Sequence, residues 1–291
     1  MLQLLGILLV IAGWMAPATA ETPSAALERG GVLRAGWEAY QRGDFPSAAS
    51  AYRKALESDA GNPVLWYNLG CLEALGGNLD EAETALERAL SADPRVAGAH
   101  DALGQIAELR GNRSAARTRY AEADRLKPGT PAFLSHLLRV DLTVSEPGAL
   151  RDTASRLLAV APDHADARLA LGVAHLKLEA PDLAIHELRR ALELNPEATT
   201  AWNALALAYA QTGEFDAARE AMAKARAGSP DDAGTLTNAG VVEAYQQRWD
   251  DARRAWEAAL AARPGFAPAR QNLEALDTLL SAESSGGEGN P

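Results

Sequence analysis

Residues 63–96 read PVLWYNLGCLEALGGNLDEAETALERALSADPRV, and this stretch decides the fold. Apolar residues recur at helical spacing in its first half, around Leu69. A turn follows at Gly77, where a left-handed backbone conformation ends a helix at little cost. Asp80 suits the positive end of a second helix, and Pro94 ends that helix because proline cannot continue it. The stretch therefore predicts two helices joined by a tight turn.

The same pattern returns every 34 residues along the chain. A column of mostly small residues contains Gly36, Gly70, Gly104, Leu138, Gly172, Ala206 and Gly240. The column near the end of each repeat contains Ala60, Pro94, Pro128, Pro162, Pro196, Pro230 and Pro264. Seven repeats run through residues 29–266 without an insertion or deletion, and chance does not hold a register over that distance.

One helix pair of this kind cannot bury its apolar face, whereas stacked pairs can. Small residues let the paired helices approach closely, and a larger residue such as Leu86, Tyr120 or Trp256 fills the gap. The sequence therefore predicts an all-α solenoid of antiparallel helix pairs. Its repeats are expected at residues 29–62, 63–96, 97–130, 131–164, 165–198, 199–232 and 233–266.

These repeats resemble the tetratricopeptide repeat (TPR) family. In the second repeat the resemblance rests on Trp66, Leu69, Gly70, Ala82, Leu86, Ala89 and Pro94. In the sixth it rests on Trp202, Leu205, Tyr209, Gly213, Ala218, Ala225 and Pro230. The resemblance covers residues 29–266 and implies a right-handed superhelix, with a concave groove lined by the first helix of each pair.

The fourth repeat, residues 131–164, departs from the pattern. Leu138 replaces the expected Gly, and Ala154 replaces the expected large residue, so the total volume is conserved. Ser145-Glu146-Pro147-Gly148 replaces the usual turn. We interpret this repeat either as a hinge or shape change in the middle of the array, or as ordinary drift of one repeat.

The remaining parts of the chain flank the repeats. A short lead-in is expected at residues 21–28, and a helix that caps the last pair at residues 267–282. The Gly- and Ser-rich residues 283–291 are expected to form a disordered tail.

Residues 1–20 read as a secretory signal. The apolar run from Leu2 to Trp14 is short of the about 20 residues that a membrane-spanning helix needs. Ala18-Thr19-Ala20 has the small residues of a signal-peptidase site, so cleavage after Ala20 is expected. No basic residue precedes the run, and an uncleaved N-terminal anchor is the alternative. Either reading predicts an exported protein, periplasmic or secreted, with a membrane-anchored form as the alternative.

Composition and motifs argue against several functions. The formal net charge of −11 repels phosphate backbones, so no nucleic-acid partner is expected. The single cysteine, Cys71, cannot form an internal disulfide and has no cation or base near it in sequence, which predicts a structural role. No catalytic motif and no metal-ligand spacing occurs, so we predict no enzyme activity, no metal and no cofactor.

The concave surface is therefore where function is expected. Residues three before, two before and one after the small-residue column are expected to face the groove. The predicted binding residues lie in first helices or in the cap, and they are Arg34, Trp37, Tyr40, Tyr67, Asn68, Gln105, His136, Arg139, Asn203, Asn238, Tyr245 and Asn272.

Two groups among these residues have alternative interpretations. One column contains Asn68, Asn238 and Asn272, and in some members of the family Asn there binds the backbone of a peptide. Other residue types interrupt this column, and Asn also serves packing. Trp37 and Tyr40 beside Arg34 either anchor a ligand or plug the first repeat.

We predict an extracytoplasmic scaffold that binds a protein or peptide in its concave groove and supports assembly of an envelope or secreted complex. The alternative is a structural protein that self-associates or docks on a membrane complex through its convex face. A more remote alternative is an enzyme with no recognisable motif. Direct membrane contact is expected only if the N-terminal segment stays uncleaved, and the sequence leaves the oligomeric state open.

Overall fold

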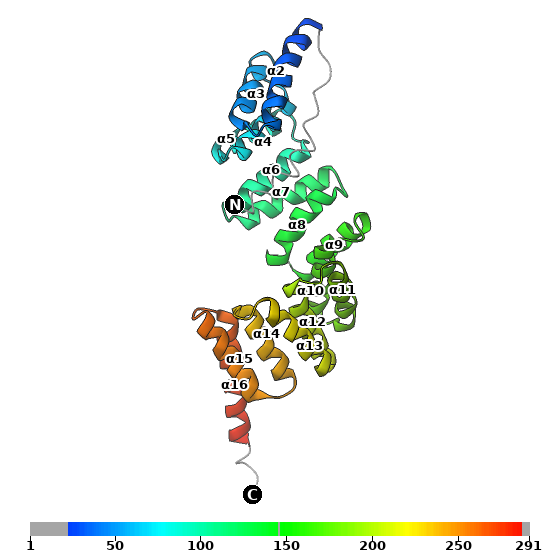
Figure 1. Cartoon of the computed structure of the whole chain (residues 1–291), viewed down its shortest axis with the longest axis vertical. Helices are drawn as coiled ribbons and strands as arrows, with labels where there is room; N and C mark the ends of the chain where they lie inside the picture. Colours follow the sequence, from blue (N-terminus) through cyan, green and yellow to red (C-terminus); the bar gives the residue numbers. More distant parts are fainter. Residues whose placement is uncertain (1–22, 145, 287–291) are drawn as a thin grey trace. The chain divides into compact units, whose positions relative to one another are not determined.

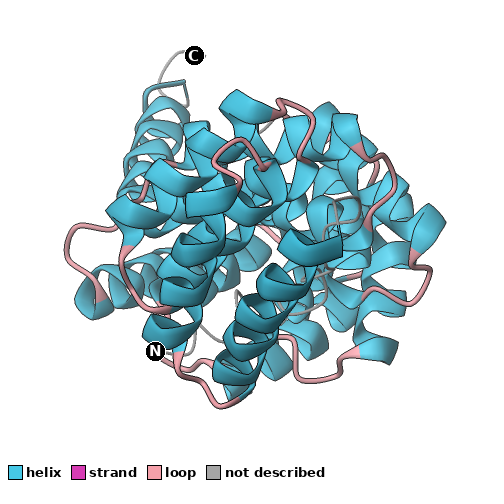
Figure 2. Ribbon diagram, turned by 90° about the horizontal axis from the view of Figure 1, so that it is seen from above, coloured by secondary structure: helices cyan, strands magenta, loops and turns pink. Residues whose placement is uncertain are grey.

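The computed structural model describes residues 23–144 and 146–286, and every regular element in these ranges is an α-helix (Figures 1 and 2). The all-α prediction is confirmed. The helices are α2 (Pro23–Gln41), α3 (Phe45–Ser58), α4 (Pro63–Leu75), α5 (Leu79–Ala92), α6 (Ala97–Leu109), α7 (Arg113–Leu126), α8 (Pro131–Val144), α9 (Pro147–Val160), α10 (Ala165–Lys177), α11 (Pro181–Leu194), α12 (Thr199–Thr212), α13 (Phe215–Gly228), α14 (Ala233–Tyr245), α15 (Trp249–Ala262) and α16 (Ala267–Gly286). The predicted signal or anchor lies outside the described residues.

The helices keep the 34-residue period of the sequence. From the second repeat on, the first helices begin at Pro63, Ala97, Pro131, Ala165, Thr199 and Ala233, and α16 begins at Ala267. The second helices begin at Phe45, Leu79, Arg113, Pro147, Pro181, Phe215 and Trp249. Consecutive helices pack on one another, for example α4 on α5 and α12 on α13, and the next repeat then packs on the second helix.

The chain divides into two compact units within the fourth repeat. The N-terminal unit is Met1–Ser145 and the C-terminal unit is Glu146–Pro291. Helix α8 packs on α7 in the first unit, and α9 packs on α10 in the second. Leu138 and Ala154, the two residues with exchanged sizes, are both buried.

Large side chains fill the space above the small-residue column, as predicted. A Cβ atom added at Gly104 would lie 2.5 Å from a ring carbon of Tyr120. At Gly172 the corresponding Cβ would lie 2.6 Å from Leu188, and at Gly240 it would lie 2.4 Å from the indole of Trp256. Since real Cβ atoms do not approach so closely, only glycine fits at these positions beside the present neighbours.

The turn between the two helices of a repeat uses a left-handed residue. The predicted glycines Gly43, Gly77, Gly111 and Gly213 have φ values between 74° and 85°. In the fifth and seventh repeats the equivalent residues are Glu179 and Gln247, with φ values of 56° and 58°. A residue with a Cβ atom is strained in this conformation.

Successive repeats are joined by a hydrogen bond that the sequence analysis did not foresee. A side chain near the start of a first helix reaches back six residues to the carbonyl of the proline column. Trp66 Nε1 donates to Ala60 O at 2.7 Å, and Trp202 Nε1 donates to Pro196 O at 2.8 Å. Arg168 donates to Pro162 O at 3.0 Å. Different residue types therefore perform one task at the same repeat position.

The C-terminal end of the array differs from the expected boundary. Helix α2 begins at Pro23, so most of the predicted lead-in is helical. Helix α16 continues to Gly286, so its last turn includes residues 283–286 that were assigned to the disordered tail. A helix end is set by backbone hydrogen bonds that Ser and Gly weaken but do not forbid, which is why composition misplaces it. Residues 287–291 lie outside the described ranges.

Replacing Gly104 by leucine should lower the free energy of unfolding by about 3 kcal/mol, because the new side chain meets the ring of Tyr120. Tyr120→Ala alone should also lower it, by about 3 kcal/mol or more, through the cavity it leaves. The free energy of unfolding of the double variant should fall by clearly less than the sum of the two single losses, because the new leucine then fills the space that the ring of Tyr120 leaves. Urea unfolding of all four proteins measures this coupling, and strictly additive losses would contradict the packing argument.

Replacing Glu179 by glycine should raise the free energy of unfolding by about 1 kcal/mol, because glycine adopts the left-handed conformation without strain. The control is Lys177→Gly at the end of α10, where glycine should lower it by about 1 kcal/mol. Thermal or urea unfolding gives both values. Equal losses in the two variants would show that the turn is not strained.

Candidate functional site

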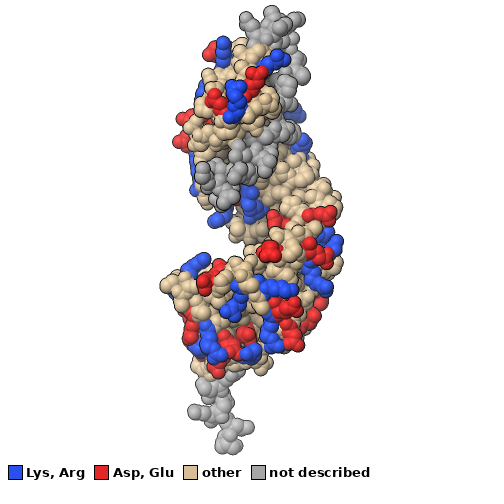
Figure 3. Space-filling model, viewed as in Figure 1, with Lys and Arg blue, Asp and Glu red and all other residues tan. Residues whose placement is uncertain are grey.

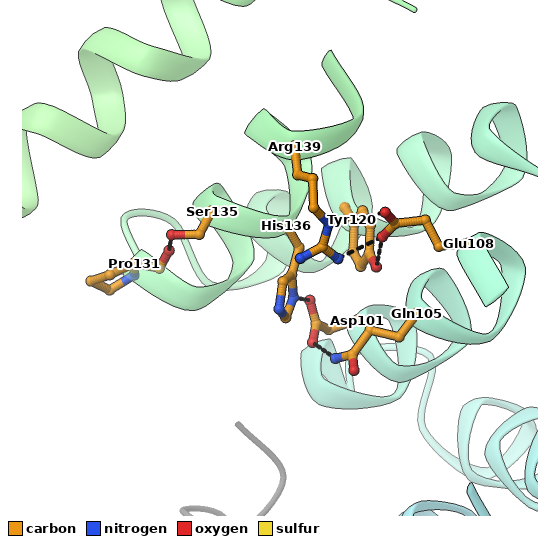
Figure 4. A network of polar contacts seen from close by, with 8 residues as sticks. All are labelled: Asp101, Gln105, Glu108, Tyr120, Pro131, Ser135, His136 and Arg139. Carbon is orange, nitrogen blue, oxygen red and sulfur yellow. Dashed lines mark hydrogen bonds and ion pairs between the residues drawn. The ribbon is translucent and has the colours of Figure 1, made fainter. Parts of the chain in front are cut away.

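Polar side chains of the N-terminal unit meet where the first helices α6 and α8 face each other (Figure 4). Asp101 on α6 is the shared acceptor. It lies 2.8 Å from His136 Nδ1 on α8 and accepts a hydrogen bond of 2.7 Å from Gln105 Nε2. All three side chains are buried, and the contact between Asp101 and His136 joins the third repeat to the fourth.

A second group of contacts holds Arg139 beside this trio. Glu108 on α6 accepts hydrogen bonds of 2.9 and 2.6 Å from Arg139 and one of 2.7 Å from the hydroxyl of Tyr120. Burial raises the pKa of Glu108, but the hydrogen bonds from Arg139 and Tyr120 outweigh burial and hold the pKa below its ordinary value. The ring centroid of Tyr120 lies 5.2 Å from that of His136. The two groups thus form one network, in which Arg139 keeps a fixed position while remaining exposed.

The network contains predicted and unpredicted residues. Gln105, His136 and Arg139 were predicted site residues, and the structure brings them together. Asp101 and Glu108 were not in the predicted set. A signal existed for both, because they are seven residues apart and therefore lie on one face of a helix that is otherwise mostly apolar.

Helix α4 contributes an apolar and aromatic part to the same unit. Tyr67 is buried, and its hydroxyl would lie only 2.8 Å from a Cβ atom at Gly98. Cys71 is fully buried beside it, and burial raises the pKa of this thiol from 9.0 to about 12. Burial also raises the pKa of Tyr67, as does the neighbouring Cys71. The thiol therefore stays protonated at neutral pH and packs as a small apolar residue, as the sequence predicted.

The other predicted site residues differ widely in exposure. Tyr67, Asn68, Gln105, His136 and Asn203 are buried, Trp37, Tyr40, Asn238 and Asn272 are half-buried, and Arg34, Arg139 and Tyr245 are exposed. The ring centroids of Trp37 and Tyr40 lie 5.3 Å apart, and Phe45 lies 6.2 Å from Tyr40. These aromatics thus contact one another at the first repeat, with Arg34 in solvent.

Three buried amide side chains share one feature. Gln105 donates to Asp101, and Asn203 on α12 donates to Thr235 Oγ1 on α14 at 2.9 Å. Asn68 likewise hydrogen-bonds Tyr52 of α3. Among the described residues, the side-chain oxygens of Asn68, Gln105 and Asn203 have no hydrogen-bond partner. An unpaired buried acceptor costs about 1–3 kcal/mol, and these oxygens lie below the surface, where a ligand does not reach them in this conformation.

Surface charges are mixed rather than gathered. Figure 3 shows acidic and basic side chains interspersed over the viewed face of the C-terminal unit. Many charged side chains of this unit form ion pairs, as Arg219 with Asp216 and Lys224 with Glu220. In the part of the chain that the structure describes, no group of three His, Cys, Asp or Glu side chains could hold a metal ion. None of the helices in residues 23–144 and 146–286 is both long and apolar enough to cross a membrane.

The pKa of Cys71 predicts a loss of stability in alkali. The unfolded chain loses the thiol proton near pH 9.0, whereas the folded chain keeps it to about pH 12, so this stabilisation is present below pH 9 and lost as pH rises through that window. Cys71→Ala should therefore lose less stability than the parent between pH 7.5 and 10.5 in urea unfolding.

A thiol reagent should also modify Cys71 of the native protein only as fast as the protein opens. Rapid modification of the native protein would show that the thiol is not buried.

Known proteins with matching sequences identify the repeats. A family model described as tetratricopeptide repeat matches residues 33–97, 76–131, 151–188 and 176–233, which together cover more than half of the chain. Superkiller complex protein 3 of Mus musculus is 24% identical over 253 residues, which are 83% of this chain and 16% of that protein. Bacteriophage adsorption protein A of Escherichia coli (strain K12) is 27% identical over 215 residues, which are 74% of this chain and 18% of that protein. The chain thus spans less than a fifth of the length of these relatives.

A solved structure shows the same fold. The crystal structure of the APC/C hetero-tetramer Cut9-Hcn1 matches with a TM-score of 0.57 and 18% identity, over 85% of this chain and 51% of that chain. The helix pairs, their period and the family match agree with one another. The chain therefore belongs to the tetratricopeptide repeat family.

Proposed function

We propose that this TPR chain is a non-catalytic, extracytoplasmic scaffold that binds a protein or peptide along the first helices of its repeats. The observation that carries the proposal is the exposed guanidinium group of Arg139 on the first helix α8, which Glu108 holds in place through hydrogen bonds of 2.9 and 2.6 Å. A guanidinium group donates hydrogen bonds to the carboxylate or carbonyl oxygens of a peptide.

The polar network of the N-terminal unit supports the same proposal. Glu108 holds the Arg139 guanidinium through two hydrogen bonds, and Asp101 holds the His136 ring. Side chains that are fixed before binding lose little conformational entropy when a partner arrives. Arg139 is therefore suited to donate hydrogen bonds to an acidic or carbonyl group of the ligand.

The contacts of the candidate nucleophiles favour a non-catalytic role. Cys71 is buried with a raised pKa, so it supplies no thiolate at neutral pH. The polar partner of His136 is Asp101, and the neighbouring Tyr120 phenol has a pKa raised mainly by burial. His136 thus touches no activated nucleophile within the described residues.

Export is the part of the proposal that rests on residues 1–20, whose apolar run and small-residue site are typical of a secretory signal. We place the chain in the periplasm or outside the cell, with membrane anchoring as the alternative. A role in the assembly of an envelope or secreted complex is in keeping with the relatives, one of which is named as a component of a complex and another as a phage adsorption protein.

The proposal is tested by affinity capture from the exported fraction with residues 21–291 as bait. A groove variant combines Arg34→Ala, Trp37→Ala, Asn238→Ala and Tyr245→Ala, none of which is fully buried. It should lose its partners by about tenfold or more, because aromatic and arginine side chains dominate binding energy.

The matched control combines Lys54→Ala, Arg88→Ala and Arg226→Ala, which are exposed on second helices. It should capture the same partners as the parent. If the groove variant captured partners as well as the parent and the control variant lost them, the partners would bind the second helices, and the groove would not be the binding site. Light scattering of the parent separates self-association from binding to another protein.

A further inference from the structure

A pocket in the C-terminal unit lies apart from the predicted groove residues. It has a volume of about 440 Å³ and lies between α11, α12 and α13. These helices pack side by side in the C-terminal unit, as Figure 1 also shows. None of the twelve groove residues lines it, and two of its three walls are second helices. Its volume falls in the range of small-molecule sites.

The α12 wall of the pocket is aromatic. Trp202 and Tyr209 are seven residues apart on one face of α12, with Leu205 between them. Trp202 Nε1 donates to Pro196 O at 2.8 Å, which fixes the orientation of the indole ring. Lys224 Nζ lies 4.4 Å from the centroid of this ring. The indole is thus a rigid wall, and Leu192 and Ala221 add apolar side chains to the lining.

The charges around the pocket leave one unmatched group. Glu193 pairs with Arg190, and Glu220 pairs with Lys224 at 3.0 Å. Arg189 also lines the pocket and is exposed, and it makes no ion pair with any described residue. The rim therefore offers a guanidinium group to an incoming anion. Guanidinium binds carboxylate in a planar geometry with two parallel hydrogen bonds.

We propose that this pocket binds an aromatic carboxylate. The aryl ring lies against Trp202 and Tyr209, and the carboxylate pairs with Arg189. The same chemistry occurs in a free aromatic acid and in a peptide that ends in an aromatic residue. Both carry an aryl ring a few bonds from a carboxylate. The site is independent of the groove, because it shares no residue with it.

The test uses residues 21–291 and saturation-transfer NMR, with binding strength taken from titration. The probes are 3-phenylpropionate, the peptide Gly-Gly-Gly-Phe with a free C-terminus, 3-phenylpropionamide and phenethylamine. At least one of the two carboxylates should bind, and the neutral amide and the amine should bind at least about tenfold more weakly, since they cannot pair with Arg189. Whichever carboxylate binds more tightly identifies the source of the ligand.

Two variants decide whether the pocket is responsible. Arg189→Ala should weaken carboxylate binding at least about tenfold, whereas Arg226→Ala, exposed on α13 and outside the lining, should leave it unchanged. Ala217→Phe, which fills the pocket, should abolish binding of the ring. Circular dichroism checks that each variant folds. Equal binding of all four probes, tighter binding of the amine, or unchanged binding in Arg189→Ala would overturn the proposal.

Discussion

Close contact between the helices of a pair constrains every other feature of each unit. A glycine within a helix costs about 1 kcal/mol relative to alanine, so its presence in the small-residue column needs an opposing gain. The gain is the burial of a large neighbour such as Tyr120, which is fully buried against Gly104. Burying a large apolar side chain stabilises a protein by roughly 1.5–3 kcal/mol. The contact therefore outweighs the cost of the glycine.

The same contact links the packing of the helices to the polar network. Tyr120 packs against Gly104, donates its hydroxyl proton to Glu108 and lies beside the ring of His136. Glu108 in turn holds Arg139. The buried ring of Tyr120 thus positions the carboxylate of Glu108, and this carboxylate positions the exposed guanidinium group of Arg139. Because the spacing of the helices is fixed by glycine, the network has little freedom to adopt another arrangement.

Much of the fold was predictable because it repeats. The period of 34 residues, the small-residue column and the left-handed glycines are local features, and each recurs often enough to be read with confidence from one chain. The site was less predictable. Helical spacing shows which face a residue occupies, but it does not show that Asp101 and His136, 35 residues apart, meet at 2.8 Å. Nor does it distinguish an exposed Arg139 from a buried Asn68 on the same kind of face.

The fourth repeat shows how polar contacts can assign a helix to a unit. Helix α8 lacks the glycine of its column, yet it is joined to α7 by the ion pair of Arg117 and Asp141 at 2.6 Å and to α6 by the contact of His136 with Asp101. The Asp141 side chain is fully buried, so the Arg117 guanidinium group stabilises a carboxylate that lies out of solvent. Such contacts hold α8 in the N-terminal unit by specific geometry rather than by apolar area alone. The division of the chain after α8 therefore has a physical cause in the residues of this repeat, whichever evolutionary history produced its exchanged Leu138 and Ala154.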